Sequence, residues 1–231
     1  MNHNQITGNH KRSAVLTLTG IAVMILLTFT KVVPSSNIAG YSVFVGIAFF
    51  FIIEAAAKTP NAESGLRLNT IVEDMKKPGV IVWMLLPGVS GIVTLVVGNL
   101  IFSGEFVAHV MGRTSSILSF DKTALLAGQV IIAAFGEEIA YRGFFLGKGM
   151  KIFPFWLCAV ISSLVFAAGH IAIGDMGIVV YDIAAVFIDS LIFSVIYHKS
   201  GNCMISTFSH IPVNAISIVA VFLVLPSHVL P

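Results

Sequence analysis

Two adjacent glutamates, Glu137 and Glu138, stand in an otherwise apolar stretch of the chain, and Arg142 follows. Neighbouring residues on an α-helix point about 100° apart, so the two carboxylates cannot share one role. Arg142 lies four residues after Glu138, on the same helical face and at a favourable spacing for an ion pair. We expect Arg142 to neutralise and orient Glu138, which leaves Glu137 free of a cation on its own helix and suited to act as a general base. A structural ion pair beside an interfacial glutamate is the alternative.

Two other apolar stretches each contain a histidine. His170 follows the small residues 167–169, which would let a neighbouring helix approach closely. His210 and Asn214 are four residues apart and project from one helical face, and Pro212 between them removes the backbone hydrogen bond to Phe208. Each histidine alone is as well explained by interhelical hydrogen bonding. Together, the four groups suit a hydrolase: a Glu and a His to deprotonate water, and a His and an Asn to stabilise an oxyanion.

The composition requires that these groups lie in a membrane. The chain is 57% hydrophobic and 10% charged, with a mean hydropathy of +0.96, whereas soluble domains are about 45–50% apolar and about 25% charged. The apolar runs are continuous over roughly 17–25 residues, the length of a membrane-spanning helix, and they lack the alternation of barrel strands. We predict an all-α, polytopic transmembrane helical bundle. The net charge of +2 gives no sign of nucleic-acid binding.

Seven spans are expected, with an eighth if a re-entrant segment lies within the interfacial residues 103–122. The predicted spans are 13–30, 38–57, 80–102, 123–146, 155–173, 178–197 and 202–225. A disordered cytoplasmic N-terminus (1–12) would precede an N-terminal membrane region (13–122), a catalytic core (123–225) and a C-terminal tail (226–231).

The placement of basic residues predicts the orientation. With alternating spans, only Lys31, Arg113 and Lys122 of the 13 lysines and arginines lie on the side opposite the N-terminus. Cytoplasmic loops are enriched in these residues, so we expect a multi-pass protein of the cell membrane with a cytoplasmic N-terminus and an external C-terminus. Cys158 and Cys203 are expected to be reduced packing residues.

Two further acidic residues fall inside a span, where each ionisable group costs at least about 2.5–3.5 kcal/mol on insertion scales. Asp182 and Asp189 are seven residues apart and lie on roughly one face of the sixth span. They are expected to line a hydrated cavity or substrate path, and a proton relay is the alternative. Glu54, near the end of the second span, is expected to be interfacial.

The order of the motifs resembles a known family. Glu137-Glu138-x-x-x-Arg142, Phe166-x-x-x-His170 and His210-x-x-x-Asn214 are similar to the three signature motifs of the CAAX-protease and bacteriocin-processing (CPBP, or Abi) family of intramembrane proteases. That family includes the endopeptidases that trim prenylated CAAX proteins. The resemblance covers about residues 123–220.

The resemblance implies a role for each motif residue. Glu137 would be the catalytic base, acting with His170 on water, and His210 and Asn214 would form the oxyanion hole. Glu138 and Arg142 would support the site. The family has been described both as metalloproteases and as glutamate-dependent proteases, and Glu137, His170 and His210 could also ligate zinc or another divalent metal with water in the fourth position. We favour the metal-free mechanism, because no HExxH motif is present.

The expected function is hydrolysis of peptide bonds in a membrane-associated peptide or protein, such as a prenylated CAAX protein or a bacteriocin. Two alternatives stay open: a proton- or ion-coupled transporter using Glu137, Asp182, Asp189 and His170, and a non-catalytic scaffold or immunity protein. One geometric difficulty remains. Straight, untilted helices would place Glu137 and His170 about 9 Å apart in depth.

Overall fold

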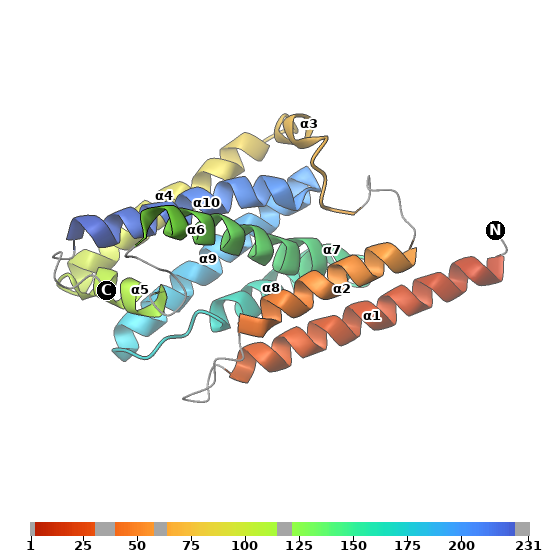
Figure 1. Ribbon diagram of the computed structural model, residues 1–231, viewed down its shortest axis with the longest axis horizontal. Coiled ribbons are helices and arrows are strands. Elements are labelled where there is room, and N and C mark those ends of the chain that lie inside the picture. Colours follow the sequence, from red (N-terminus) through yellow and green to blue (C-terminus); the bar gives the residue numbers. More distant parts are fainter. Residues whose placement is uncertain (1–2, 31–39, 58–63, 115–121, 225–231) are drawn as a thin grey trace.

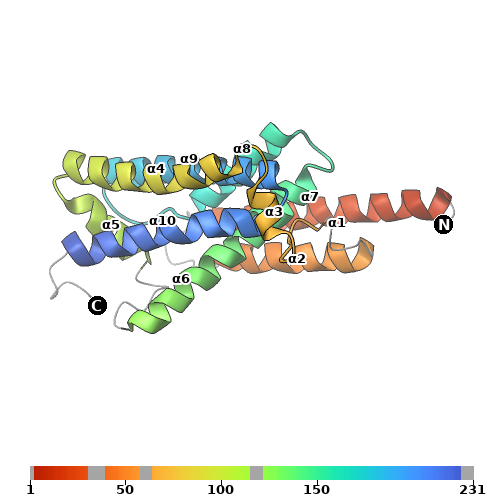
Figure 2. The same cartoon turned by 90° about the horizontal axis from the view of Figure 1, so that it is seen from above.

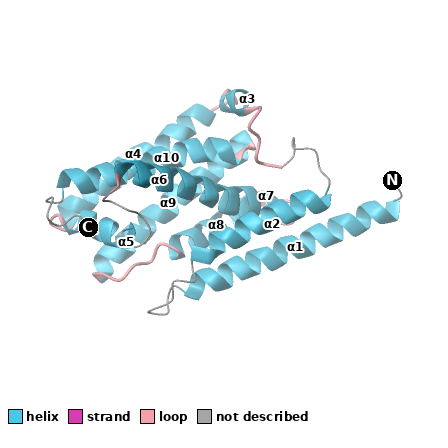
Figure 3. Ribbon diagram, in the orientation of Figure 1, coloured by secondary structure: helices cyan, strands magenta, loops and turns pink. Residues whose placement is uncertain are grey.

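The computed structural model describes residues 3–30, 40–57, 64–114 and 122–224 of the 231-residue chain. These residues are helical apart from short connections, and none of them forms a β-strand (Figure 3). The predicted all-α class is therefore confirmed for the described chain. The predicted C-terminal tail, 226–231, lies outside these residues.

The helices follow one another with short turns. In chain order they are α1 (His3–Phe29), α2 (Tyr41–Ala57), α3 (Ile71–Met75), α4 (Val80–Ile101), α5 (Glu105–Thr114), α6 (Thr123–Glu138), the π-helix η4 (Ile139–Leu146), α7 (Gly147–Gly149), α8 (Phe155–Ala168), α9 (Met176–Ser200) and α10 (Cys203–Val224).

Five helical segments in the described chain are long and apolar enough to cross a membrane: Lys11–Phe29, Val80–Ile101, Ala124–Gly149, Met176–Ser200 and Cys203–Val224. The second and fifth predicted spans correspond to shorter apolar helices, Tyr41–Ala56 and Phe155–Ala168. A helix needs about 20 apolar residues to span a bilayer, so the count of seven spans is not confirmed. The interfacial segment contains α5, whose buried face is Phe106, Val107 and Val110.

The outer surface of the bundle is apolar. Side chains such as Leu85, Ile132 and Leu223 are 65%, 73% and 81% exposed. A soluble monomer does not leave so many large aliphatic groups in water, because contiguous apolar surface of this extent promotes association. This surface and the five long helices indicate a multi-pass membrane protein whose aliphatic side chains face lipid.

Helix α10 occupies the centre of the arrangement that builds the site. It packs against α4, α6 and α9, while α1 and α2 lie side by side and contact the rest of the bundle mainly through η4 and α8 (Figures 1 and 2). The first residues of α1 lie at the right end of Figure 1, and the last residues of α10 lie at the left end. The polar motif residues on α6 and α10 are thus enclosed by other helices.

The fourth predicted span is not a continuous α-helix. Its second half, η4, is a π-helix whose residues are all buried. π-Helical turns are rare and are found frequently at functional sites. Small residues allow η4 to lie against α2: a Cβ atom added to Gly46 would come within 2.7 Å of the Ala140 Cβ atom. Because this geometry depends on contacts with another helix, the local sequence pattern did not predict it.

The fifth predicted span also ends earlier than expected. Helix α8 stops at Ala168, and His170 lies in the turn that follows, with its backbone N–H donating to the carbonyl oxygen of Ala167 (2.9 Å). Non-helical backbone at membrane depth is tolerated only where protein or a water-filled cavity surrounds it. The turn after α8 is such a place, because His170 lines a pocket.

At the other end of the chain, helix α1 begins at His3, and the assignment of residues 1–12 as a disordered segment stays a prediction. No proline separates these polar residues from the first apolar run, and the helix continues through them.

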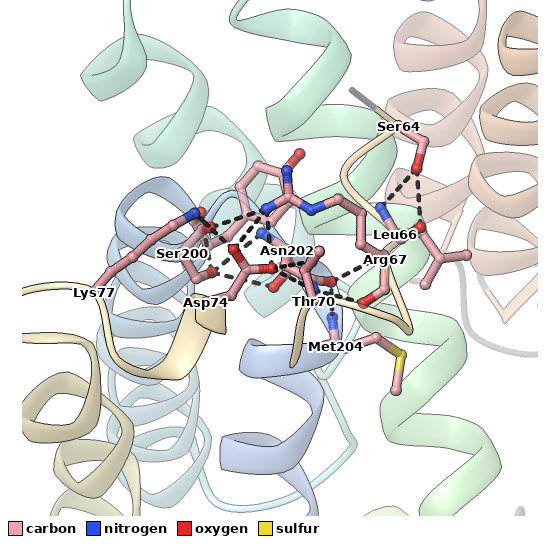
Figure 4. A network of polar contacts seen from close by, with 10 residues as sticks. Ser64, Leu66, Arg67, Thr70, Asp74, Lys77, Ser200, Asn202 and Met204 are labelled. Carbon is pink, nitrogen blue, oxygen red and sulfur yellow. Dashed lines mark hydrogen bonds and ion pairs between the residues drawn. The ribbon is translucent and has the colours of Figure 1, made fainter. Parts of the chain in front are cut away.

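A network of polar contacts joins α3 to the turn between α9 and α10 (Figure 4). Asp74 of α3 accepts hydrogen bonds from Thr70 (2.7 Å), Asn202 (2.9 Å) and Arg67 (2.9 Å), and it forms an ion pair with Lys77 (2.7 Å). This network fixes the turn from which α10 starts, and α10 then carries His210 and Asn214 into the bundle.

Candidate active site

The expected ion pair between Glu138 and Arg142 is confirmed. Arg142 Nη1 lies 3.1 Å from Glu138 Oε1, and both side chains are almost fully buried. Two opposite charges in an apolar interior stabilise each other only when further hydrogen bonds satisfy their remaining polar atoms. The contacts around each of these two side chains therefore decide whether the pair is a rigid element of the site.

Arg142 is held from several sides. Its Nη2 donates to the backbone oxygen of Ser190 (2.9 Å) and to the Ser190 hydroxyl (2.8 Å). Its guanidinium carbon lies 4.9 Å from the ring centre of Phe166 and 5.2 Å from that of Phe193. Cation–π contacts of this kind strengthen when they are desolvated. Arg142 thus connects η4 with α8 and α9.

His210 lies between the two glutamates. Its Nδ1 is 3.0 Å from Glu138 Oε1, and its Nε2 is 3.6 Å from Glu137 Oε2. The Phe193 ring stacks on the imidazole with a centroid distance of 4.6 Å and an interplanar angle of 26°. An ionised Glu138 can only accept, so the Nδ1 atom of His210 donates in this contact. The orientation of the ring is therefore fixed by an ion-paired carboxylate, and its Nε2 atom faces Glu137.

His170 and Asn214 share a pocket with His210. The pocket has a volume of about 80 Å³, enough for a few water molecules, and its lining includes Phe166, His170, Phe193, His210 and Asn214. The Nδ1 atom of His170 lies 2.8 Å from the carbonyl oxygen of Phe166. A carbonyl oxygen only accepts, so Nδ1 carries the proton and a neutral His170 has an acceptor at Nε2.

The depth difference expected between Glu137 and His170 stays a prediction, and Glu137 is not among the residues that line the pocket of His170. His170 and His210 line one pocket, and His210 is 3.6 Å from Glu137. The turn after α8 and the enclosure of α10 among α4, α6 and α9 bring the three motif stretches together.

Glu137, His170 and His210 are the candidate metal ligands of this site. Within the described ranges, no group of three or more His, Cys, Asp or Glu side chains is arranged to hold a metal ion. One ring nitrogen of His210 is directed to Glu138, which is itself paired with Arg142. This contact leaves the Nε2 atom of His210 available, but in the described chain Glu137, His170 and His210 are not assembled as a three-ligand metal site.

Asp182 has partners that the sequence did not reveal. Its carboxylate lies 2.7 Å from Arg113 Nη1 and 3.4 Å from His109 Nε2, both on α5. Asp182, Asp189 and Arg113 line the same pocket as the two histidines, as expected of the aspartates from their shared helical face. An aspartate inside a span needs a partner, but no local sequence pattern indicated that α5 supplies this partner. Glu54 similarly pairs with the buried Lys148.

The ring of Phe193, which stacks on His210, was also not predicted as part of the site. Phe193 had no signal in the sequence, since a phenylalanine in a span is ordinarily a packing residue. Cys158 and Cys203 are free and buried, as expected.

The fold and the site define a class: a polytopic helical membrane protein with a buried Glu/Arg/His cluster beside a pocket. Within this class, residues 119–216 match the model of a family described as type II CAAX prenyl endopeptidase Rce1-like. All three motifs lie in the matched segment, in agreement with the resemblance of the motifs to that protease family. No curated protein and no solved structure gives a significant match.

Proposed function

We propose that this protein is an intramembrane endopeptidase that hydrolyses peptide bonds in membrane-associated substrates, with prenylated CAAX-type proteins as the leading substrate class. The observation that carries the proposal is the position of His210 between Glu137 and Glu138, beside a pocket that His170 and Asn214 also line. The family match supports a peptidase activity.

In the proposed reaction, Glu137 and the Nε2 atom of His170 hold the attacking water. Glu137 takes a proton from the water as its oxygen bonds to the carbonyl carbon of the substrate. His210 and Asn214 then donate hydrogen bonds to the oxyanion that forms.

The charges of the cluster support this role for His210. Its Nδ1 proton is directed to Glu138, so donation from Nε2 to an oxyanion requires the imidazolium form. Two ionised glutamates are then balanced by Arg142 and by the imidazolium. Such a balance removes the large cost of an isolated charge in an apolar interior.

The test uses the purified chain in lipid vesicles with a farnesylated, internally quenched peptide that carries a CAAX-type C-terminus. We expect cleavage by the wild type and a loss of about 10²-fold or more in Glu137→Gln and His170→Ala. Glu73→Gln, an exposed glutamate on α3, is the matched control and should keep full activity. Equal rates in all four proteins would remove the assignment.

The same assay addresses the substrate and the metal. A peptide identical except for the missing prenyl group should be cleaved more slowly if the lipid tail anchors the substrate. Activity should persist after chelation and dialysis, with less than one zinc per chain by elemental analysis. Loss on chelation and recovery with zinc would contradict the metal-free mechanism.

We further propose that the N-terminus is cytoplasmic and the C-terminus external, because of the distribution of lysines and arginines. Fusions of a reporter that is active on only one side of the membrane should report opposite sides for the two termini. The same side for both would require an even number of spans.

A further inference from the structure

The pocket contains two aspartates in different environments. Asp182 is paired with Arg113 and His109. Asp189 forms no ion pair among the described residues, and its Oδ1 atom is buried without a hydrogen-bond partner there, while Ser90 of α4 reaches the carboxyl group. Asp189 is thus a titratable group in the pocket to which the proposed mechanism gives no role.

Asp189 lies close to the proposed oxyanion groups. It is one helical turn before Phe193, whose ring stacks on His210, and Asn214 is one turn after His210. Helices α9 and α10 are joined by a short turn at Gly201 and run antiparallel, so Asp189 and Asn214 lie at a similar level. Both residues line the pocket.

The surroundings favour the neutral acid form of Asp189. An uncompensated carboxylate is costly to desolvate, whereas a carboxylic acid can donate a hydrogen bond. His210 does not pair with it directly, since the two ring nitrogens of His210 face Glu138 and Glu137.

We propose that Asp189 is a further catalytic residue, which gives its carboxyl proton to the nitrogen of the departing amine. This inference rests on the proposed peptidase function. Glu137 has taken a proton from water, and the water oxygen is bonded to the former carbonyl carbon. The carbon–nitrogen bond then breaks, its electron pair stays on nitrogen, and nitrogen gains the proton from Asp189. A carboxylic acid and an amine leave, and transfer of the proton from Glu137 to Asp189 through water restores the site.

The role predicts different effects on amide and ester substrates. An amine is a poor leaving group without a proton, whereas an alcohol leaves far more readily. The experiment compares a peptide substrate with a depsipeptide that differs only by an ester at the scissile bond. We expect Asp189→Asn to lower the rate on the amide by about 10²-fold or more and the rate on the ester by less than about 5-fold. Asp189→Glu should recover part of the amide activity.

The controls separate this role from others. Glu137→Gln should lose both activities, since both reactions need activated water. Asp182→Asn, which changes the paired aspartate of the pocket, should affect the two substrates equally. An equal loss of amide and ester activity in Asp189→Asn, or no loss, overturns the role of Asp189 while leaving the peptidase function intact. Wild-type protein that cleaves neither substrate overturns both proposals.

Discussion

At the scale of single residues, the site depends on how the buried charges are paired. Glu138 is fully buried and Arg142 is 1% exposed, yet each contacts further polar groups. Because Arg142 touches Glu138, Ser190 and two aromatic rings, it fixes the carboxylate that in turn orients His210. The planar guanidinium makes these contacts simultaneously, which the single ammonium group of a lysine cannot do.

Arg142→Lys should therefore be damaging even though it keeps the charge. We expect a loss of about 2–3 kcal/mol in the free energy of unfolding, the size of a hydrogen bond to a charged group, and slower peptide cleavage. Thermal unfolding in detergent micelles measures the first effect. Arg12→Lys, at an exposed position on α1, is the control. If Arg142→Lys has the same melting temperature as Arg12→Lys, the geometry of the guanidinium group is unimportant for stability.

At the scale of elements, the contact between α2 and η4 sets the shape of the fourth span. Gly46 of α2 meets Ala140 of η4 so closely that an added Cβ atom would lie 2.9 Å from the Ala140 Cα atom. Gly128 of α6, in contrast, has open space around the position of a Cβ atom. The two glycines are therefore a matched pair for testing this contact.

We expect Gly46→Ala to cost about 1–3 kcal/mol, because backbone must move to accommodate the methyl group. Gly128→Ala should be neutral or stabilising by up to about 1 kcal/mol, because alanine favours the helix. Melting temperatures of the two variants in the same detergent make the comparison. If Gly46→Ala melts as high as Gly128→Ala, then α2 and η4 do not pack as closely as described.

A second element-scale feature is α3, outside the membrane spans. Burial acts to raise the pKa of Asp74, but hydrogen bonds from Lys77, Thr70 and Asn202, with the charge of Arg67, lower it from 3.8 to about 2. A carboxyl group with a lowered pKa contributes stability that is fully present above pH 3.8 and is lost as the pH falls through about 2. The turn that starts α10 should therefore loosen in acid.

Asp74→Asn should lower the melting temperature at neutral pH and flatten its decline between pH 4 and pH 2, the interval given by those two pKa values. Melting curves in detergent at several pH values test this. Glu73→Gln, an exposed neighbour, should keep the wild-type profile. A wild-type acid profile in Asp74→Asn would show that other carboxyl groups cause the acid sensitivity.

At the scale of the whole molecule, the apolar outer surface indicates that lipid surrounds the helical bundle. Ile92 lies near the middle of α4 and is 51% exposed, and Leu68 is 69% exposed in the polar segment before α3. An acidic side chain at the centre of a span costs about 2.5–3.5 kcal/mol on insertion scales, whereas one in an aqueous loop costs little.

Ile92→Asp should therefore reduce the amount of protein in the membrane fraction, while Leu68→Asp should not. Quantitative immunoblots of membrane fractions compare the two variants at equal expression. Equal accumulation would mean that this face of α4 is not lipid-exposed.

The sequence by itself determined the membrane class, the helical fold and the pairing of Glu138 with Arg142. Hydropathy and helical spacing are local properties, so they do not depend on how the rest of the chain folds. The three motifs also indicated the protease family that residues 119–216 match.

Only the tertiary structure decided how the groups meet. The π-helix of η4, the turn that contains His170 and the pairing of Asp182 with Arg113 all depend on contacts between distant segments. The place of His210 between two glutamates depends on the packing of α10 against α6, which involves residues 72 positions apart. Helical periodicity fixes which side chains share a face, but packing fixes which faces meet and at what depth.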